Sequence, residues 1–436
     1  MKTIQIGILG CGIVGTGVAR LLIKKRALLT ARTGIVLNLK RVADLDITRD
    51  RGVKFDPGVL TTDVDAVISD PDIDIIVETI GGKTLAKEFT LRALKQKKHV
   101  VTANKALLAS FGNELVAAAM ENRVDLAFEA STGGCMPVIK ALRESLVANR
   151  IESITGILNG TCNYILTKMS KEKCSFEAAL KQAQEKGFAE ADPFLDIEGH
   201  DSAHKLAILI ALAYGMEMNL KDIHVEGITS ITPLDIEFAK EFGYVIKLLA
   251  ISKNNSETVE ARVHPAMVRL SNPLAHVDKS MNAVTIDGDA TGKTMLYGHG
   301  AGMMPTASAV LSDIVDISRN IISGAGNRIP ILGLDTAAVK PASILPIKEI
   351  HTPYYFRFSA ADQPGVLSRI SGILGDCGIS IKIVHQKGRR TNGSVPVVMI
   401  THLAKEEHAQ KALEGISALD SILDKPVVIR IEDNEY

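Results

Sequence analysis

Apolar residues in the first third of the chain form short, nearly continuous runs. Such runs, bounded by turn-forming residues, predict buried strands. The predicted strands are residues 3–9, 35–43, 73–77, 99–102 and 124–129. Residues 16–25 instead repeat apolar positions at helical spacing, so a helix should connect the first two strands. This order of strand, helix and strand predicts a parallel α/β sheet.

The most apolar segment of the chain follows Asp201. Residues 206–213 are apolar on every face, which is typical of a helix enclosed by protein. Asp201 and Lys205 lie four residues apart and therefore share one face of this helix. We expect its first turn to open into a cleft. A helix-start ion pair without any catalytic role would have the same spacing, so the pattern leaves both interpretations open.

An acidic segment precedes this helix. Glu190 and Asp196 supply carboxylates, while Gly187 and the pair Asp192–Pro193 predict a loop. Loop carboxylates that face a lysine at the mouth of a buried helix suit an amino-acid substrate. The segment is therefore a candidate substrate site.

Two histidines at the same helix start allow another interpretation. His200 and His204 share a helical face, as the paired histidines of zinc enzymes do. No glutamate directly follows His200, and Glu198 is the one candidate for a third ligand. The pattern favours histidines that are solvated or hydrogen-bonded.

The rest of the pattern predicts a mixed sheet with helices on one face and then a small separate unit. A strand from residue 151 should break at Asn159–Gly160–Thr161, where a ligand-binding backbone and a plain turn are both consistent. Other predicted elements are a helix at 235–249, a strand at 258–263, a hairpin at 283–297 and a helix at 307–320. After a linker at 323–352, strands are predicted at 354–358, 380–386, 395–401 and 427–431. With two helices between them, the order is the β-α-β-β-α-β of a ferredoxin-like unit.

Composition excludes several function classes. The chain has 436 residues, enough for two or three domains, and 50 basic residues balance 50 acidic ones. A net charge of zero gives no attraction toward nucleic acid or an anionic membrane. The five cysteines have no metal-type pairing, and no apolar run is long enough to span a bilayer. We expect a cytoplasmic protein with reduced thiols.

A glycine motif follows the first strand directly. Gly10, Gly12 and Gly15 form G-x-G-x-x-G between strand and helix, where they allow a tight turn, close approach of a pyrophosphate, and helix–strand packing. Asp44 ends the second strand and could bond the ribose hydroxyls of NAD. Arginines at 41, 49 and 51 could offset its charge beside a 2′-phosphate, so the choice between NAD and NADP stays open.

Two other positions suit a cofactor or substrate. Lys105 follows the strand 99–102, where a cation could meet a ligand at the carboxyl edge of the sheet, although a solvated loop lysine is also consistent. The glycines of 298–302 precede a predicted helix, and such a start suits a phosphate or a cofactor amide.

The central segment also resembles a known family. The pattern A-x-x-x-G-F-A-x-x-D-P-x-x-D-I-x-G-x-D-x-x-x-K, from Ala183 to Lys205, is similar to the homoserine dehydrogenase signature at every fixed position. The segments GILGCGIVG, VTANK, FEASTGG, LNGTCNYI and GAGMMPTASAV agree in the same order along the chain. The motif D-Q-P-G-V-L at 362–367 resembles that of ACT domains, which often bind amino acids as feedback signals.

The resemblance implies reversible hydride transfer between L-homoserine and L-aspartate 4-semialdehyde with NADP or NAD, a step toward threonine, methionine and isoleucine. It implies that Lys205 is the acid/base residue and that Asp201 positions Lys205 or the substrate. It further implies that Glu190 and Asp196 hold the substrate ammonium, and that Lys105 lies beside nicotinamide and substrate.

The resemblance also implies cofactor and cation contacts. The implied cofactor contacts are Gly10, Gly12, Ile13, Val14, Gly15, Asp44, Lys105, Gly187 and Gly302. A monovalent cation, Na⁺ or K⁺, would be held at Glu129, Thr132, Gly134 and Met136. The chain has Ala43 where many NADP-preferring members have a basic residue, so an NADP preference does not carry over.

The resulting expectation is an α/β enzyme of three domains. The expected domains are a Rossmann nucleotide domain at 1–131, an α+β catalytic and dimerisation domain at 132–322 whose last helix returns to the nucleotide domain, a linker at 323–352, and a ferredoxin-like ACT domain at 353–436. Threonine is the candidate effector, and a homodimer or homotetramer is the expected assembly. A non-catalytic amino-acid sensor and a zinc hydrolase at His200 and His204 remain as alternatives.

Overall fold

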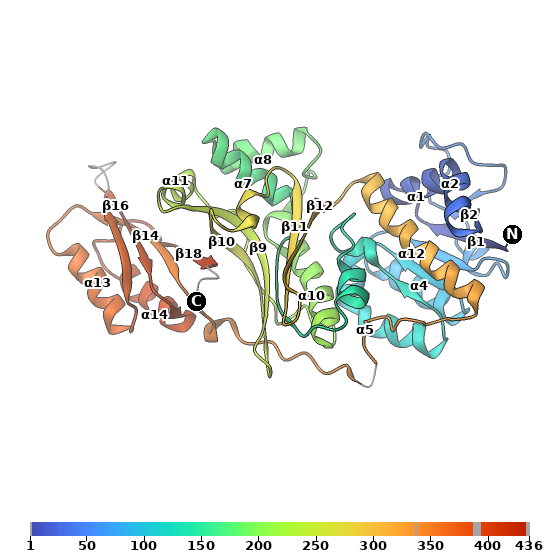
Figure 1. The fold of residues 1–436 in the computed structure, drawn as a ribbon. Coiled ribbons are helices and arrows are strands. Elements are labelled where there is room, and N and C mark those ends of the chain that lie inside the picture. Colours follow the sequence, from blue (N-terminus) through green and yellow to red (C-terminus); the bar gives the residue numbers. More distant parts are fainter. Residues whose placement is uncertain (1, 336–337, 387–393, 433–436) are drawn as a thin grey trace. The chain divides into compact units, whose positions relative to one another are not determined.

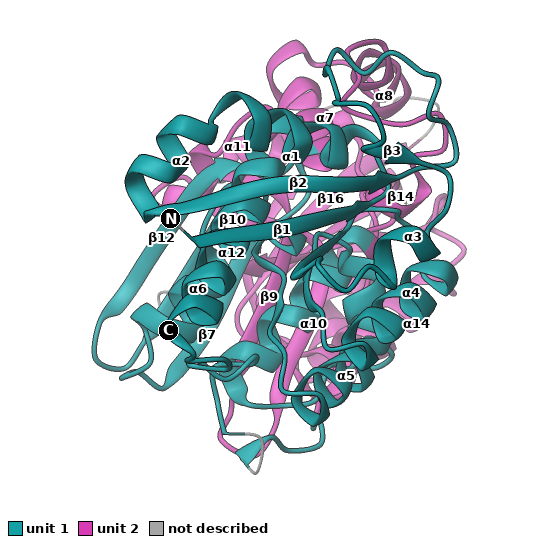
Figure 2. Ribbon diagram, turned by 90° about the vertical axis from the view of Figure 1, so that its right-hand side faces the viewer, with its two compact units in different colours: residues 1–160, 201–223, 281–343 teal, residues 161–200, 224–280, 344–436 magenta. Residues whose placement is uncertain are grey.

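A computed structural model describes residues 2–335, 338–386 and 394–432 (Figure 1). The chain divides into two compact units, coloured separately in Figure 2. Unit 1 comprises residues 1–160, 201–223 and 281–343, and unit 2 comprises residues 161–200, 224–280 and 344–436. Among the described residues, no helix combines the length and the apolar character needed to cross a membrane.

Unit 1 contains the expected parallel sheet. Its strand order is β3-β2-β1-β4-β5-β6, and each pair of neighbouring strands is parallel. The strands are β1 Lys2–Leu9, β2 Ile35–Ala43, β3 Leu60–Thr61, β4 Ile75–Glu78, β5 His99–Thr102 and β6 Leu126–Ala127. The prediction of a strand from 124 to 129 was too long, because Glu129 already begins a 3₁₀ turn, η1 Glu129–Ser131. The fold class predicted from the apolar runs is confirmed.

Helices cover this sheet, and one of them comes from far along the chain. They are α1 Ile13–Lys24, α2 Arg26–Thr33, α3 Asp65–Ile68, α4 Thr84–Lys95, α5 Lys105–Glu121 and α12 Met303–Ser323. Helix α12 packs against α1, as Figure 1 shows. A Cβ atom on Gly17 would lie 2.8 Å from the carbonyl oxygen of Met303 and 3.0 Å from Cβ of Ala307, so the glycine permits this close approach. Apolar residues of α12, such as Val310 and Ile314, share one buried core with β1 and α1.

The rest of unit 1 forms a second, antiparallel layer with a buried helix. Strands β7 Ile151–Ile157, β11 Met281–Gly288 and β12 Gly292–His299 pair in the order β12-β11-β7, which confirms the predicted hairpin. Helix α10 spans His200–Tyr214, and every residue from Asp201 to Leu212 is buried. The prediction of an enclosed helix is therefore confirmed. A short helix α6 Val138–Lys140 runs directly into a π-helical turn, η2 Ala141–Ser145.

Unit 2 is built on a sheet with the order β9-β10-β18-β14-β16-β15, and β8 pairs with β10 beside it. Its strands are β8 His224–Val225, β9 Tyr244–Asn254, β10 Val259–Arg269, β14 Tyr354–Ala361, β15 Ile381–Gln386, β16 Ser394–Thr401 and β18 Val427–Glu432. Its helices are α7 Gly160–Glu172, α8 Phe176–Glu185, α9 Phe194–Ile197, α11 Pro233–Glu241, α13 Val366–Asp376 and α14 Glu406–Ser417. Short turns and strands complete it: η3 Pro273–His276, η5 Ile347–Glu349, β13 His351–Thr352 and β17 Ala404–Lys405.

The predicted helix at 235–249 is wrong in its second half. Helix α11 starts with a capping box at Thr232 and Asp235 and ends at Glu241, and Gly243 then adopts a φ of +81°. Residues 244–254 are strand β9 instead, paired antiparallel with β10 along its length. Because β9 is buried on both faces, its apolar positions do not alternate, and that removed the signal that separates strand from helix.

The C-terminal residues adopt the predicted β-α-β-β-α-β order. Strands β18, β14, β16 and β15 are antiparallel neighbours, and the core contains Tyr354, Phe356 and Phe358. Strand β18 also pairs parallel with β10, with Ala266 opposite Arg430. The C-terminal domain is therefore joined to β10 by backbone pairing between strands as well as by the covalent linker.

Candidate active site

The first turn of α10 holds a buried ion pair. Lys205 Nζ donates to Asp201 Oδ2 at 2.7 Å and to the carbonyl oxygen of Leu158 at 2.6 Å. The side chains of both charged residues are 9% exposed. A lysine ammonium has three N–H donors. These two acceptors therefore leave one donor for the oxygen of a ligand.

Asp201 is the centre of this cluster. Its Oδ2 also accepts from Asn159 Nδ2 at 2.9 Å, and its Oδ1 lies 3.1 Å from Lys105 Nζ. Burial raises the pKa of the Asp201 carboxyl, but the charges of Lys205 and Lys105 outweigh it and hold the pKa far below its usual range. Asp201 is therefore a permanent anion between two lysines.

Lys105 connects the cluster to the parallel sheet. It opens α5 directly after β5, and the preceding residue, Asn104, caps that helix through Leu107 N–H. Asn104 Nδ2 also donates to the carbonyl oxygen of Gly82 at 2.7 Å, which holds the turn after β4. The lysine pair thus lies at the carboxyl edge of the strands, where ligands bind in such sheets.

The same edge contains the glycine turn. Glu78 ends β4 fully buried and accepts from Thr102 Oγ1 at 2.6 Å and from Ile80 N–H at 2.9 Å. A Cβ atom on Gly10 would lie 2.8 Å from the backbone of Ile80, so only glycine fits beside that turn. Together with the contacts of Lys105, these contacts therefore connect the first turn of α10 with the glycine turn after β1, and all of them lie within unit 1.

The motif glycines have the environments expected of a dinucleotide turn. Gly10 has a φ of +90°, and a Cβ atom on Gly15 would lie 2.0 Å from the carbonyl oxygen of Gly10. A Cβ atom on Gly12 would meet nothing within 4 Å, which leaves open space where a pyrophosphate could approach. Ile13, which is 69% exposed, begins α1 at the same turn. Gly302 precedes α12 with a φ of +122°, a conformation that L-residues rarely adopt.

Asp44 lies beside the glycine turn and is already paired. Its carboxylate accepts from Cys11 N–H, and Oδ1 lies 3.0 Å from Arg51 Nη2. Arg51 Nε also donates to the carbonyl oxygen of Cys11 at 2.8 Å. Arg41 instead contacts Asp70 at 3.5 Å. Among the arginines at positions 41, 49 and 51, it is Arg51 that forms an ion pair with Asp44.

The acidic segment belongs to unit 2. Thr161, in the first turn of α7, donates to the carbonyl oxygen of Phe188 at 2.7 Å and to Asp196 Oδ2 at 3.1 Å. Glu190 is exposed, and its carbonyl oxygen accepts from Gln184 Nε2. Gly187 has a φ of +72°. Thr161 therefore fixes the segment at two points and orients Asp196.

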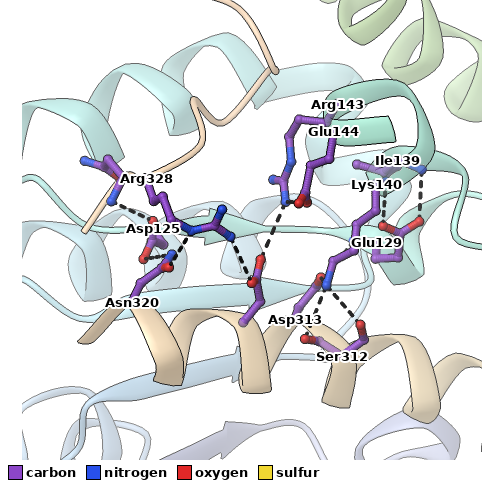
Figure 3. Close-up of polar contacts among 12 residues, drawn as sticks. Asp125, Glu129, Ile139, Lys140, Arg143, Glu144, Ser312, Asp313, Asn320 and Arg328 are labelled. Atoms are coloured by element: carbon purple, nitrogen blue, oxygen red, sulfur yellow. Dashed lines mark hydrogen bonds and ion pairs between the residues drawn. The ribbon is translucent and has the colours of Figure 1, made fainter. Parts of the chain in front are cut away.

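A second acidic cluster surrounds the turn after β6 (Figure 3). Both carboxylate oxygens of Glu129 accept backbone N–H groups at the start of α6, from Ile139 at 2.9 Å and Lys140 at 2.8 Å. Glu129 N–H donates to Asp313 Oδ2 on α12 at 2.8 Å, and Lys140 Nζ lies 3.6 Å from Asp313 Oδ1. Burial and the nearby Asp313 raise the pKa of Glu129 to about 7, and burial raises that of Asp313 to about 6.

This turn presents further oxygens without protein partners. Ser131 Oγ and Thr132 Oγ1 are buried, and neither has a hydrogen-bond partner among the described residues. Gly134 has a φ of +60°, and a Cβ atom there would lie 2.5 Å from the carbonyl oxygen of His299. A buried carboxylate with a raised pKa and unpartnered oxygens are chemically suited to a hard monovalent cation. Within the described ranges, no cluster of three or more His, Cys, Asp or Glu side chains could hold a metal ion.

Asn159 is the site residue whose role the sequence did not reveal. It follows β7, and its amide orients Asp201 from a position 42 residues earlier in the chain. The sequence signalled a break at this point, but not which side chain would meet α10. Lys105 and Asp201 are likewise 96 positions apart and meet through folding alone.

Family models match most of the chain. The description "Homoserine dehydrogenase, NAD binding domain" matches residues 10–129, "Homoserine dehydrogenase" matches residues 137–315, and "ACT domain" matches residues 354–420.

Individual relatives agree with these matches. The chain is 42% identical over 433 residues to a homoserine dehydrogenase of Neisseria gonorrhoeae, with 99% of both chains covered. The crystal structure of a homoserine dehydrogenase from Thiobacillus denitrificans is 43% identical, covers 99% of both chains and has a TM-score of 0.94. A hyperthermophilic archaeal homoserine dehydrogenase mutant in complex with NADPH is 26% identical with a TM-score of 0.62, and the match covers 73% of this chain and 98% of that one. The family models and the full-length relatives all agree on one family. The chain therefore belongs to the homoserine dehydrogenase family.

Proposed function

We propose that this protein catalyses the reversible NAD(P)-dependent interconversion of L-aspartate 4-semialdehyde and L-homoserine. The proposal rests on the buried pair of Lys205 and Asp201, which the partly exposed Lys105 contacts at the edge of the nucleotide-binding sheet. A carbonyl that becomes an alkoxide in a dry site needs a proton donor, and a lysine N–H directed into that site supplies one. This step would serve threonine, methionine and isoleucine synthesis.

Lys205 is proposed as the acid/base residue. The bound nicotinamide would supply or accept the hydride. In the reductive direction Lys205 gives a proton to the carbonyl oxygen, and in the oxidative direction it takes the proton from the hydroxyl. Asp201 and the carbonyl oxygen of Leu158 fix the ammonium so that one N–H remains for the substrate. Lys105 would contact nicotinamide and substrate from the sheet side.

Glu190 and Asp196 are proposed to bind the substrate ammonium. A carboxylate pairs with an ammonium by charge-assisted hydrogen bonds. The hydrogen bond from Thr161 gives Asp196 a defined orientation, which supports this role. Glu190 is exposed, so its side chain can turn toward a ligand.

The proposed cofactor contacts start at the glycine turn. Gly10, Gly12 and Gly15, with Ile13 and Val14, would hold the pyrophosphate at the start of α1. Asp44, Lys105, Gly187 and Gly302 complete the proposed set. Asp44 favours NAD through the ribose hydroxyls, whereas Arg51 offers a cation beside it for NADP. The NADPH complex of the archaeal relative supports NADP as a cofactor.

A monovalent cation, Na⁺ or K⁺, is proposed at the turn after β6. Glu129 and the backbone oxygens of Thr132, Gly134 and Met136 would hold it. Its charge would offset the buried carboxylates of Glu129 and Asp313, and in that way it would stabilise the turn that connects the sheet to α6.

Regulation and assembly complete the proposal. The ACT domain at residues 354–420 is proposed to bind an amino-acid effector, with threonine as the candidate. The family resemblance supports a homodimer or homotetramer. All five cysteines are free, which supports a cytoplasmic location.

A coupled absorbance assay tests the proposal directly. Purified protein should oxidise NADPH or NADH when L-aspartate 4-semialdehyde is added, and L-homoserine should drive the reverse reaction. Rates in K⁺ or Na⁺ should exceed those in a bulky organic cation, which cannot enter a compact oxygen site. Absence of turnover with both nicotinamides would overturn the proposal.

A further inference from the structure

Arg430 on β18 joins the C-terminal domain to the segment that directly follows β8. Its side chain is 4% exposed. Nη1 and Nη2 donate to the two carboxylate oxygens of Glu226, each at 2.9 Å. Nε and Nη2 also donate to Glu406, at 2.8 and 2.6 Å. Because the guanidinium is planar and rigid, these two forks fix Glu226 relative to Glu406.

Glu406 anchors this arrangement inside the C-terminal domain. It opens α14, is 2% exposed, and accepts the hydroxyl of Tyr354 on β14 at 2.8 Å and the amide of Gln410 at 2.7 Å. Glu406 therefore connects Arg430 on β18 with α14 and, through the Tyr354 hydroxyl, with β14. A movement among those elements would be passed to Glu226.

Glu226 remains an anion in this setting. Burial raises the pKa of its carboxyl, but the hydrogen bond with His224 and the charge of Arg430 outweigh it and hold the pKa far below its usual range. The fork is therefore a pair of full charges, with stronger hydrogen bonds than a neutral pair would form.

The residues after Glu226 pack directly on α9. Ile228 N–H donates to the carbonyl oxygen of Ile197 at 2.8 Å. A Cβ atom on Gly227 would lie 2.5 Å from the same oxygen and 2.6 Å from the carboxylate of Glu198. Since no side chain separates the two backbones, a shift of Glu226 would move the end of α9.

Helix α9 carries Asp196. The Asp196 carboxylate accepts from Thr161 at 3.1 Å, and its carbonyl oxygen accepts from Cys162 Sγ at 3.1 Å. Asp196 directly precedes Ile197 in the chain, and it is the acid assigned above to the substrate ammonium. A continuous set of contacts therefore connects Arg430 with a substrate-binding carboxylate.

We propose that Glu226, held by Arg430, is a positioning residue that sets the place of Asp196 and through it couples the C-terminal domain to substrate affinity. The inference rests on the proposed function, because it needs Asp196 to bind the substrate. A carboxylate that is displaced by a fraction of an ångström loses hydrogen-bond geometry with the ammonium. Loss of the hydrogen bonds between Arg430 and Glu226 should therefore lower the affinity for the substrate and leave the affinity for the nicotinamide unchanged.

Glu226→Gln in the full-length protein tests this coupling. Its side chain is 39% exposed, and Arg430 keeps its fork to Glu406, so the fold should persist. We expect the KM for L-aspartate 4-semialdehyde to rise about tenfold, because small misplacements at a binding site have large effects. The KM for the nicotinamide should stay within about twofold, as for an independent site.

Gly227→Ala supplies a second, independent variant. It leaves Arg430 and Glu226 intact but places a methyl group against the carbonyl oxygen of Ile197. It should raise the substrate KM in the same direction and leave the nicotinamide KM unchanged. This variant keeps the inference testable even if Glu226→Gln were to fold poorly.

Arg357→Met is the matched control. Arg357 Nε lies 2.6 Å from the buried Asp235 on α11, so this partly buried pair also joins the C-terminal domain to preceding structure. Helix α11 leads into β9 rather than into α9. We expect a lower Tm for this variant, with the substrate KM within about twofold of the parent value.

The outcomes separate the two proposals. A parent protein without turnover would overturn the proposed function. A parent with turnover, together with unchanged substrate KM in both Glu226→Gln and Gly227→Ala, would overturn the coupling alone. Equal rises in substrate KM for Glu226→Gln and Arg357→Met would indicate general loosening and would also overturn it.

Discussion

At the scale of single residues, the site depends on charges that face one another in a buried place. Asp201 lies between Lys205 and Lys105, and Asn159 supplies the remaining hydrogen bond to it. Removing one partner of a buried ion pair leaves an uncompensated charge, which is far more costly than losing a surface pair. Each member therefore contributes to geometry as well as to chemistry.

Lys205→Met should abolish most turnover without unfolding the protein. The thioether side chain fills similar space but cannot transfer a proton, so kcat should fall by about 10²–10⁴-fold. The Kd of the nicotinamide, measured by fluorescence titration, should stay within about twofold. Lys411→Met on the exposed face of α14 is the control and should leave kcat unchanged. A Lys205→Met enzyme with near-parent kcat would remove this lysine from the mechanism.

His264 on β10 should make stability depend on pH. It is fully buried, and burial, Arg430 and Arg262 lower its pKa well below 6.5, while Glu226 acts in the opposite direction. Below about pH 6.5 the unfolded chain binds a proton at this histidine that the folded chain does not bind, so stability falls as pH falls. The free energy of unfolding should drop by up to about 1.4 kcal/mol per pH unit from this group. Above pH 7 its contribution should be constant.

His264→Gln provides the comparison for this prediction. Glutamine has no proton to gain in this range, so the plot of Tm against pH between 5 and 7 should be flatter for the variant than for the parent. Parallel plots for the two proteins would contradict the prediction.

At the scale of elements, close backbone approach decides how α1 and α12 meet. Gly17 lies where a Cβ atom would be 2.8 Å from the carbonyl oxygen of Met303. Helix α1 also carries the glycine turn, so a shift of this helix would displace the nucleotide site. Packing and cofactor binding are therefore coupled through one residue.

Gly17→Ala should destabilise the protein and weaken nicotinamide binding. Overpacking against a fixed backbone oxygen costs about 1–3 kcal/mol. Gly372→Ala in α13 is the matched control, because a Cβ atom there meets nothing within 4 Å and alanine favours a helix by about 0.5–1 kcal/mol. Thermal melts and cofactor titrations of both variants would test this, and equal Tm shifts would refute the packing argument.

At the scale of the whole molecule, the C-terminal domain is part of the sheet of unit 2 rather than an appendage. Strand β18 pairs with β10, and Arg262 on β10 bonds Glu432 on β18 at 3.1 Å. Arg262 is 1% exposed. Its charge is compensated in part by a residue from the end of the chain.

A chain that ends at Thr352 should therefore be unstable. Truncation removes Glu432 and exposes the edge of β10, which could then pair with other chains. Loss of the buried partner alone would cost about 3–5 kcal/mol. We expect a lower Tm and association during gel filtration. A monodisperse truncated protein with the parent Tm would show that the domain is independent.

Much of the fold could be inferred from local patterns. Continuous apolar runs predicted β2 and β5 at their observed bounds, and the apolar stretch after Asp201 predicted a buried helix. These predictions succeed because short apolar runs between turn-forming residues are long enough for a strand but not for a helix, whereas the long run after Asp201 suits a buried helix. The long match to the homoserine dehydrogenase signature, confirmed by full-length relatives, identified the family.

By itself, then, the sequence determined most strands of the parallel sheet, the order of the C-terminal elements, the family and the residue types at the site, since each depends on neighbours along the chain. Tertiary structure alone decided that residues 244–254 form a strand, that Asn159 orients Asp201, and that Arg430 joins Glu226 to Glu406. The physical reason is that these partners lie tens to hundreds of residues apart. Their pairing depends on which surfaces the folded chain brings together, and no local periodicity encodes it.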